Sequence, residues 1–476
     1  MPANEEKRRA VEVLTKNNFL VSPELLSILD DEEKMKKILG LENSPGPNEA
    51  EIRNTLYGEG KVKIIKSYKE DEKKKSVSDF VLNFNARYRK LKEILQKKQE
   101  LQDALSIKRV MAKSEKEKVS IIGMVYEKRE TKNNNIIFTL EDPTGQIKVI
   151  VTKSKSDLIK AAADCVCDEV IGINGTYTKG IIFADNILLP EIPATNELKK
   201  SPEDAYAIFT GDNHVGSKHF LHESFDNFIA WINGRIGNEE QKEIAKKVKY
   251  IFVVGDLVDG IGIYPTQYQD LELKDIKKQY EQFLLDIKKI PRHMEIVICP
   301  GNHDALRLIE PQPPLYGDYA GELGELPNVH LVSNPAIVNI GATKTFPGFN
   351  VLMYHGSSFH FYSEKVESIR QQGGAKRADL IMKYLLQKRH LAPEHTSANY
   401  MPNSEEDPML IDLVPDFFVT GHVHRSTASS YRNISMINSS CWIGMTDFQE
   451  KVGLIPEPAR VVAVNLQTRE TKIMRF

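Results

Sequence analysis

The sequence is poor in cysteine, has almost no net charge and lacks any long apolar run. Its four cysteines, Cys165, Cys167, Cys299 and Cys441, suit a reducing cytoplasm. The net charge of −2 gives no overall attraction to nucleic acid or to an anionic membrane, so any DNA binding must come from local basic patches. No apolar run approaches a membrane span, and no signal-like core follows Met1 to Arg9. We expect a cytoplasmic protein with no membrane partner.

What is present describes a globular chain of more than one domain. Hydrophobic residues make up 41% and charged residues 27% of the 476 residues, and this length predicts two or three domains. Cys165 and Cys167 are a weak metal signal because no second cysteine pair accompanies them. We interpret them as ordinary helix or loop cysteines.

The N-terminal part predicts small helices in residues 1–39, followed by a linker over 40–76. Apolar residues recur at helical spacing, and Ser22-Pro23 can cap a second helix that includes Leu25 and Leu26. A Pro/Gly-rich break at 43–48 and a charged run at 69–75 mark the linker.

Residues 77–195 predict a connecting helix and a β-barrel. An apolar stripe runs along a helix expected over 78–103, and its Lys/Arg face is expected to be solvated, with DNA binding as the alternative. Five strand candidates follow, with a short helix after the third; they are 119–125, 136–140, 147–152, 169–173 and 181–187. This is the order of an OB-fold. Only Phe138 is available for stacking on strands 2 and 3, so we favour a scaffold or subunit-contact role over single-strand binding.

From residue 196 to 476, strands alternate with helices, which predicts an α/β domain. Five polar clusters there each follow an apolar, strand-like run. They are Gly211-Asp212-Asn213-His214, Gly255-Asp256-Leu257-Val258-Asp259, Gly301-Asn302-His303-Asp304, Tyr354-His355-Gly356 and Gly421-His422-Val423-His424. Such sheets build their sites beyond the ends of their strands. The pattern predicts a hydrolytic metal centre.

Hydrolysis of a phosphate ester near neutral pH needs an activated water and stabilised charge on the phosphoryl oxygens. Two metals about 3.5–4 Å apart supply both. A carboxylate must bridge the ions, and imidazoles with an amide oxygen complete mixed N/O shells. Asp212 and His214 alternate along the chain, so both can point at one ion.

The other clusters complete this set. His422 and His424 show the same alternation and can each reach a different ion. Asp256 lies at the centre of the order and is the natural bridge, while Asn302 and His355 fill the remaining positions. His355 is the least certain ligand because His360 lies nearby.

The blocks D-x-H, G-D-x-x-D, G-N-H-D, H-G and G-H-x-H, in this order over about residues 205–445, resemble the calcineurin-like metallophosphoesterase superfamily. The resemblance implies a two-sheet α/β domain. It implies one metal on Asp212, His214, Asp256 and His424, and a second on Asp256, Asn302, His355 and His422. His303 would then donate a proton to the leaving alkoxide with the assistance of Asp304, and Asp259 would orient a neighbouring ligand.

Two positions bear on the substrate. Protein phosphatases of this superfamily carry arginine just after the second aspartate of G-D-x-x-D and glutamate after G-N-H. This chain has Gly260 and Asp304 there, which fits the nuclease-like branches better.

The expected order of helices, linker, OB barrel and phosphoesterase domain resembles the small, B-type subunits of replicative DNA polymerases. Eukaryotic members have lost metal ligands, whereas this chain keeps the whole set, so it looks like the small subunits of archaeal family-D polymerases. Residues 78–88 and 368–377 also look like that family. The second segment is basic, so Arg370, Lys376 and Arg377 are expected to approach a DNA backbone; the alternative is a solvated helix start.

The resemblance implies a 3′–5′ proofreading exonuclease that acts on single-stranded or mismatched 3′ ends. Its partners would be the large catalytic subunit and, through the holoenzyme, the sliding clamp, which places the protein at the nucleoid. We expect two divalent metals, with Mn²⁺ first and Fe, Ni, Zn or Mg as alternatives. A stand-alone phosphodiesterase would leave the barrel unexplained, and the intact ligand set opposes a non-catalytic scaffold.

Overall fold

The computed structural model describes residues 2–16, 29, 32–40, 62–70, 74–403 and 405–476, and the chain divides into two units. The smaller unit comprises residues 1–63 and 340–347. Its helices α1 (Pro2–Lys16) and α3 (Glu32–Gly40) pack through a small apolar cluster that includes Leu14 and Ile38. The helix expected after Ser22-Pro23 and the break at 43–48 lie outside the described residues.

The larger unit, residues 64–339 and 348–476, contains two six-stranded sheets and a closed barrel. The first sheet has the order β1-β11-β12-β13-β15-β14. Its strands are β1 (Val62–Ser67), β11 (Ala336–Ile340), β12 (Phe349–Met353), β13 (Phe417–Thr420), β14 (Thr427–Tyr431) and β15 (Ile434–Asn438). β12, β13 and β15 are parallel, and β14 closes the far edge as an antiparallel strand.

The second sheet has the order β10-β9-β8-β7-β16-β17. Its strands are β7 (Tyr206–Thr210), β8 (Val248–Val254), β9 (Glu295–Cys299), β10 (Val329–Leu331), β16 (Arg460–Asn465) and β17 (Thr471–Arg475). β7 to β10 are parallel, and β16 and β17 add an antiparallel edge. The parallel strands are nearly continuous apolar runs, as expected of strands buried on both faces.

Phenylalanines join the two sheets face to face. Phe209 of β7 stacks on Phe252 of β8 with ring centroids 5.0 Å apart, and it meets Phe417 of β13 at 5.7 Å. Phe349 of β12 packs edge-on against Phe417. Such pairs add to the burial of apolar area between the layers.

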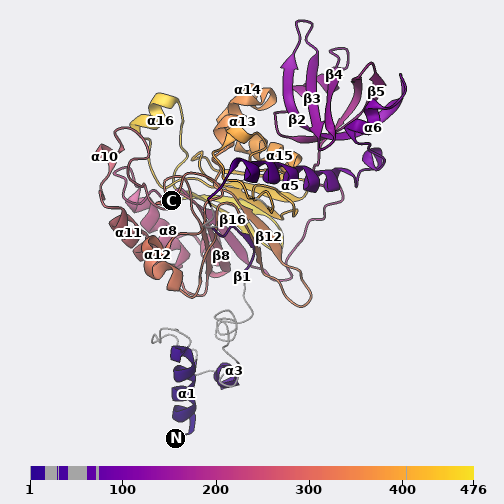
Figure 1. The fold of residues 1–476 in the computed structure, drawn as a ribbon. Coiled ribbons are helices and arrows are strands. Elements are labelled where there is room, and N and C mark those ends of the chain that lie inside the picture. The colour runs from indigo at the N-terminus through magenta and orange to yellow at the C-terminus, as the bar shows by residue number, and fades with distance from the viewer. Residues whose placement is uncertain (1, 17–28, 30–31, 41–61, 71–73, 404) are drawn as a thin grey trace. The chain divides into compact units, whose positions relative to one another are not determined.

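Helices cover the outer face of each sheet (Figure 1). On the second sheet lie α8 (His222–Ile232), α9 (Glu239–Lys246), α11 (Ile276–Lys288) and α12 (Gly317–Ala320), with Phe228 and Phe283 in the shared core. The short helix α10 (Gln267–Asp270) lies in the connection after β8, where Gln267 bonds to Asp259. On the first lie α13 (Phe359–Lys365), α14 (Glu367–Gln371) and α15 (Ala378–Lys388), with Tyr362 and Leu385 in its core. The last helix of the chain is α16 (Asp447–Val452).

The barrel has the strand order β2-β3-β4-β6-β5, as an OB-fold requires. Its elements are β2 (Lys118–Glu130), β3 (Ile136–Asp142), β4 (Gly145–Val151), α7 (Ser156–Ala163), β5 (Val170–Thr178) and β6 (Ile181–Leu188), with α6 (Ile107–Met111) before them. The short helix falls between the third and fourth strands. The predicted fold class is confirmed.

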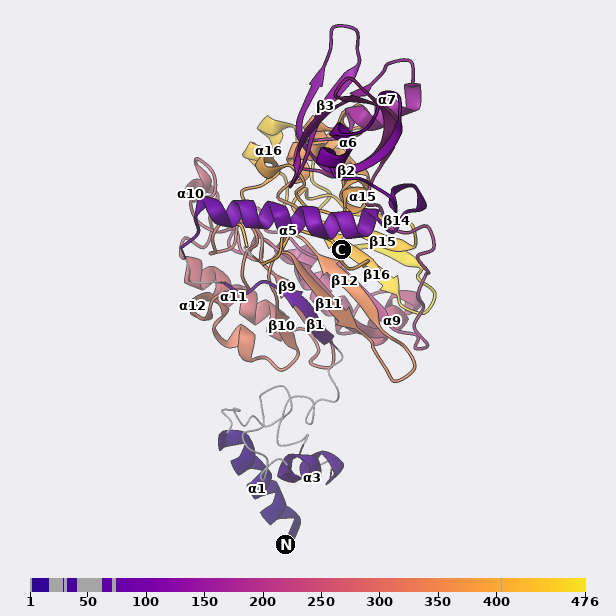
Figure 2. The same ribbon diagram turned by 45° about the vertical axis from the view of Figure 1, so that its right-hand side comes forward.

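Helix α5 (Val77–Leu95) lies along the larger unit between the barrel and the sheets (Figure 2). A capping box starts it, because the backbone N–H of Ser76 donates to Asp79 at 2.7 Å. One basic residue departs from the solvated face that the sequence predicts: Arg87 is fully buried. Its guanidinium donates to Asp407 at 2.6 Å and to the carbonyl oxygen of Pro393 at 2.6 Å.

Strand β1 is a second departure from the sequence analysis. It lies inside the range expected to be a linker, 40–76, and forms the edge of the first sheet. Apolar and polar residues do not alternate along β1 as they do in a half-buried strand, and Ile64 and Ile65 are both exposed. The sequence therefore gave no indication of a strand here. Among the described residues, no helix is both long and apolar enough to cross a membrane.

Candidate metal centre

The five polar clusters follow strands of both sheets. Asp212 and Asp256 come after the parallel strands β7 and β8, and Asn302 comes after β9. His355 and His422 follow the parallel strands β12 and β13 of the other sheet. The carboxyl ends of parallel strands meet at one edge, so the two sheets bring their side chains to a common site.

Five of these residues have left-handed backbone. The φ angles are 49° at Asp212, 51° at His214, 49° at Asp256, 71° at His422 and 54° at His424. Side-chain-bearing residues adopt this region at a cost, and they cluster in it at functional sites. The sharp turns point successive side chains into the same space.

Three glycines let these side chains approach the backbone. A Cβ atom at Gly255 would stand 2.2 Å from Nδ1 of His355, and one at Gly301 would stand 2.3 Å from Oδ1 of Asp256. A Cβ atom at Gly421 would stand 2.5 Å from Oδ2 of Asp212. Any side chain at these positions would displace a metal-binding group.

Two groups of side chains share Asp256. The first is Asp212, His214, Asp256 and His424, and the second is Asp256, His355 and His422; within each group the ligand atoms lie within 4.8 Å of one another. Asn302 joins the second group, since its Oδ1 is 3.1 Å from Nε2 of His355. Oδ2 of Asp256 is 3.7 Å from Nε2 of His214 and 3.3 Å from Nε2 of His355.

These separations fit a metal shell. Two donors about 2.1 Å from one cation, at angles between square and tetrahedral, stand about 3.0–3.4 Å apart. Nε2 of His214 and Nε2 of His424 are 3.1 Å apart, and the latter is 3.4 Å from Oδ1 of Asp212. Lone pairs that face each other so closely repel unless a proton or a cation lies between them. The buried N/O donor set therefore fits divalent cations.

Hydrogen bonds orient two of the imidazoles. Nδ1–H of His355 donates to the carbonyl oxygen of Val254 at 3.0 Å, and Nδ1–H of His214 donates to Oδ1 of Asp259 at 3.2 Å. Each bond leaves the Nε2 lone pair directed at Asp256. Burial acts to raise the pKa of Asp256, but His355 and His303 outweigh it and hold this pKa well below its usual range. The residue common to both groups is thus an ionised carboxylate.

His303 lies at the rim of this cluster. Its ring is 4.5 Å from that of His214, and its Nδ1–H donates to the carbonyl oxygen of Asp259 at 2.8 Å. Its backbone N–H donates to Oδ1 of Asp256 at 2.8 Å. The hydrogen bond at Nδ1 leaves Nε2 as the ring nitrogen that could meet a bound molecule.

Asp304 is the residue that the resemblance assigns to assist His303. Its carboxylate accepts from the backbone N–H of Gly301 at 2.8 Å and from the hydroxyl of Tyr280 at 3.1 Å. The backbone N–H of Leu257 donates to it as well. Burial, with a contribution from Asp256, raises the pKa of Asp304 to about 7. The buried side chain fixes the loop that carries His303.

The three residues expected to approach DNA differ in their surroundings. Arg370 and Lys376 are exposed, whereas Arg377 makes a bidentate pair with Asp379 at 2.8 and 2.7 Å. None of the metal-binding groups found among the described residues includes a cysteine.

Sequence reasoning missed three polar residues that hold this centre. Gln267 donates to Oδ2 of Asp259 at 3.0 Å, and Tyr280 reaches Asp304 from α11. No local pattern connects either residue to its partner. Nε2 of Gln449 lies 2.7 Å from Nδ1 of His424, and here a signal existed: Thr446 and Gln449 have capping-box spacing at the start of α16. His360 also lies beside His422, with ring centroids 5.1 Å apart.

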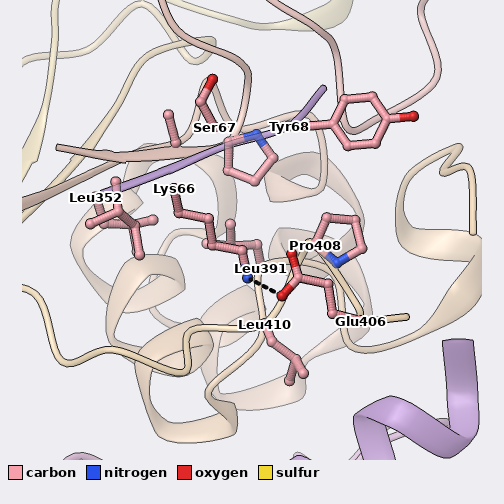
Figure 3. A pocket seen from close by; sticks show the side chains of 11 residues that line it. Lys66, Ser67, Tyr68, Leu352, Leu391, Glu406, Pro408 and Leu410 are labelled. Atoms are coloured by element: carbon pink, nitrogen blue, oxygen red, sulfur yellow. Dashed lines mark ion pairs between the residues drawn. The ribbon is translucent and has the colours of Figure 1, made fainter. Parts of the chain in front are cut away.

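A separate pocket of about 30 Å³ lies beside β1 (Figure 3). Apolar side chains such as Leu352, Leu391 and Leu410 line it, and the ion pair of Lys66 with Glu406, 3.5 Å long, crosses it. None of the metal-binding groups found in the described chain includes a residue of this pocket.

Comparisons with known proteins agree with this arrangement. Residues 207–426 match the calcineurin-like phosphoesterase family. The DNA polymerase II small subunit of Methanothermobacter thermautotrophicus is 38% identical over 82% of this chain and 78% of its own length. The small subunit from Pyrococcus furiosus is 34% identical over 96% and 74%, and the one from Archaeoglobus fulgidus is 34% identical over 88% and 81%.

Among solved structures, asparaginyl-tRNA synthetase from Pyrococcus horikoshii is 16% identical with a TM-score of 0.17, over 18% of this chain and 22% of its own. That similarity is too limited to bear on function. The relatives cover most of this chain, and the phosphoesterase match spans all five polar clusters. The chain therefore belongs to the family of archaeal DNA polymerase II small subunits, the small subunits of family-D polymerases.

Proposed function

We propose that this chain is the proofreading 3′–5′ exonuclease of a replicative DNA polymerase and supports its large catalytic subunit. The observation that carries the proposal is the pair of ligand groups that share Asp256, with His303 beside them. The family membership supports a role in DNA synthesis. The products would be nucleotides released from single-stranded or mismatched 3′ ends.

Two divalent cations would be held by these groups and would activate water and neutralise charge on the phosphoryl oxygens. One would be held by Asp212, His214, Asp256 and His424, and the other by Asp256, Asn302, His355 and His422. Mn²⁺ is the metal we propose, because mixed imidazole, carboxylate and amide donors suit it.

The protein's own groups would do three things. His303, when protonated, would give the Nε2 proton to the leaving 3′ oxygen while its Nδ1–H remains bonded to the carbonyl oxygen of Asp259. Asp259 would keep His214 in the tautomer that presents Nε2. Asp304 would hold the loop between Gly301 and His303 in place.

Gly260 supports a nuclease over a phosphoprotein phosphatase. It stands where the phosphatases have arginine, and its φ is +75°. A Cβ atom there would lie 2.3 Å from the carbonyl oxygen of His303. The loop therefore has no room for the arginine side chain on which those enzymes rely.

The rigid connection of the barrel supports a polymerase subunit over a stand-alone phosphodiesterase. Glu169, at the start of β5, accepts from Nζ of Lys388 at 2.7 Å and from the hydroxyl of Tyr384 at 2.6 Å, both on α15. Arg87 adds a second link through Asp407. We propose that barrel and phosphoesterase domain present one surface to the large subunit and to DNA.

A nuclease assay tests this function. The full chain with Mn²⁺ should shorten 5′-labelled single-stranded DNA from its 3′ end, and a 3′-mismatched primer-template should be cut faster than a matched one. His303→Ala is the matched control for a contaminating nuclease. Co-expression with the large subunit should yield a complex of the two chains. Release of phosphate from phosphoserine peptides with DNA left intact would overturn the proposal.

A further inference from the structure

A buried polar network lies behind the second ligand group, and no step described above uses it. Its members are Glu310, Gln312 and Asn334, each at most 1% exposed. The carboxylate of Glu310 accepts from the hydroxyl of Ser357 at 2.8 Å and from that of Tyr354 at 3.1 Å. These two residues flank His355 and Gly356 in the sequence.

Amide hydrogen bonds run from one ligand loop to the other. The backbone N–H of His355 donates to Oδ1 of Asn334 at 2.9 Å, and Nδ2 of Asn334 donates to Oε1 of Gln312 at 2.9 Å. Nε2 of Gln312 then donates to the carbonyl oxygen of Gly301 at 2.9 Å. Gly301 precedes Asn302, so two amides connect the loops of His355 and Asn302.

Glu310 adds a constraint on the direction of this relay. Nδ2 of Asn334 also donates to Oε1 of Glu310 at 3.1 Å, and an ionised carboxylate can only accept. The amide group of Asn334 must therefore face Glu310, and its oxygen must face the N–H of His355. The backbone N–H of His355 favours the same orientation, so a neutral side chain at 310 would remove one of two constraints on the Asn334 amide.

We propose that Glu310, through Asn334 and Gln312, is a positioning residue that sets the distance between Asn302 and His355 for the second cation. The inference rests on the proposed function, since it concerns the ligands of that site. Buried partners of ligands hold their orientation, and the loss of such a partner lowers metal affinity by about 10–100-fold. The first ligand group shares only Asp256 with the second, so its affinity should change much less than that of the second site.

The variant Glu310→Gln keeps the shape of the side chain and replaces one acceptor by a donor. Metal binding to the full chain is titrated with Mn²⁺ alone, by the electron paramagnetic resonance of free Mn²⁺. The titration is done at pH 8, because burial raises the pKa of Glu310 to about 7. We expect one of two sites to weaken about 10–100-fold, and kcat on single-stranded DNA to fall with KM unchanged.

Glu169→Gln is the matched control, because Glu169 is also a buried carboxylate that accepts from a tyrosine hydroxyl. It should lower the thermal midpoint and leave both Mn²⁺ affinities as in the wild type. Glu310→Asp, which keeps an acceptor, should recover part of the lost affinity. Equal weakening of both sites, or unchanged binding in Glu310→Gln, would overturn the inference. A wild type that binds no Mn²⁺ would instead overturn the proposed function.

Discussion

Two buried clusters of histidine and aspartate in this protein look alike in composition and differ in their charge balance. In the cluster of Arg87, His390 and Asp407, the guanidinium and Nε2–H of His390 both donate to Oδ2 of Asp407, at 2.6 and 2.9 Å. Nδ1 of His390 accepts from the backbone N–H of Ala392 at 3.0 Å. The donors named here each meet an acceptor, and the positive charge that balances Asp407 is the guanidinium of Arg87.

The cluster around Asp256 has imidazoles in place of a guanidinium. Nε2 atoms of His214 and His355 face its carboxylate, and Nε2 of His424 faces that of His214 at 3.1 Å. A buried cluster that contains its own cation is structural. A buried cluster of converging carboxylate and imidazole groups is suited to a cation from solution, as the proposed function requires.

The same substitution at the two aspartates gives the sharpest contrast. Asp256→Asn should abolish nuclease activity, because a neutral amide cannot balance two bridged dications. The folded protein should remain. Activity on single-stranded DNA and metal content after dialysis measure the effect. Full activity with both metals retained would remove Asp256 from its bridging role.

His303→Ala should separate proton transfer from metal binding. We expect a rate lower by about 10²–10⁴-fold, the usual loss for a general acid. Metal content should equal that of the wild type, because the ring of His303 contacts the carbonyl oxygen of Asp259. A variant that loses a metal would show that His303 is a ligand.

Asp407→Asn should show the opposite pattern to Asp256→Asn. It leaves the buried guanidinium of Arg87 without its counter-charge, so unfolding should become easier by about 3–5 kcal/mol. Metal content and kcat should be unchanged. The double variant Arg87→Met with Asp407→Leu should regain much of the loss. Urea unfolding of the three proteins is the measurement, and a single variant as stable as the wild type would contradict the prediction.

The pH dependence of stability sharpens the contrast further. Burial, together with Arg87, lowers the pKa of His390 from 6.5 to about 4. As the pH falls through this window the unfolded chain takes up the proton first, so stability is lost between about pH 6.5 and 4. Asp407 has a pKa below its ordinary value of 3.8, so the free energy of unfolding continues to fall when the pH drops below 3.8.

His390→Gln should reduce the loss in the free energy of unfolding between pH 7 and pH 4 by at most about 3 kcal/mol. Each pKa unit corresponds to about 1.4 kcal/mol. Urea midpoints are compared from pH 7 to pH 4 in the presence of a chelator, which removes the contribution of bound metal. Parallel curves for the wild type and the variant would show that His390 does not set the slope.

Local patterns predicted what lies within one segment, and contacts between segments stayed hidden. The barrel strands follow from short apolar runs, and Asp142-Pro143-Thr144-Gly145 marks the hairpin between β3 and β4. The five polar clusters were visible because each follows its own strand. The burial of Arg87 was not visible, since its partner Asp407 is 320 residues away.

Contacts between residues far apart in the sequence were also hidden around Asp256. The resemblance assigned Asp304 to assist His303, and only the fold reveals that the hydroxyl of Tyr280 on α11 donates to its carboxylate. Glu310 and Asn334 lie outside every recognisable motif, and only the folded chain brings them to the ligand loops.

The left-handed backbone at the ligands has a consequence for how such a protein can change over time. At His214, where φ is 51°, glycine would relieve about 1 kcal/mol of conformational cost that alanine would keep. We therefore expect His214→Gly to melt above His214→Ala when both are free of metal. At each left-handed position, a change to glycine would raise the free energy of unfolding and remove a side chain that the proposed catalysis needs. If the proposed nuclease function holds, a lineage released from the need to cleave DNA would drift toward losing these residues.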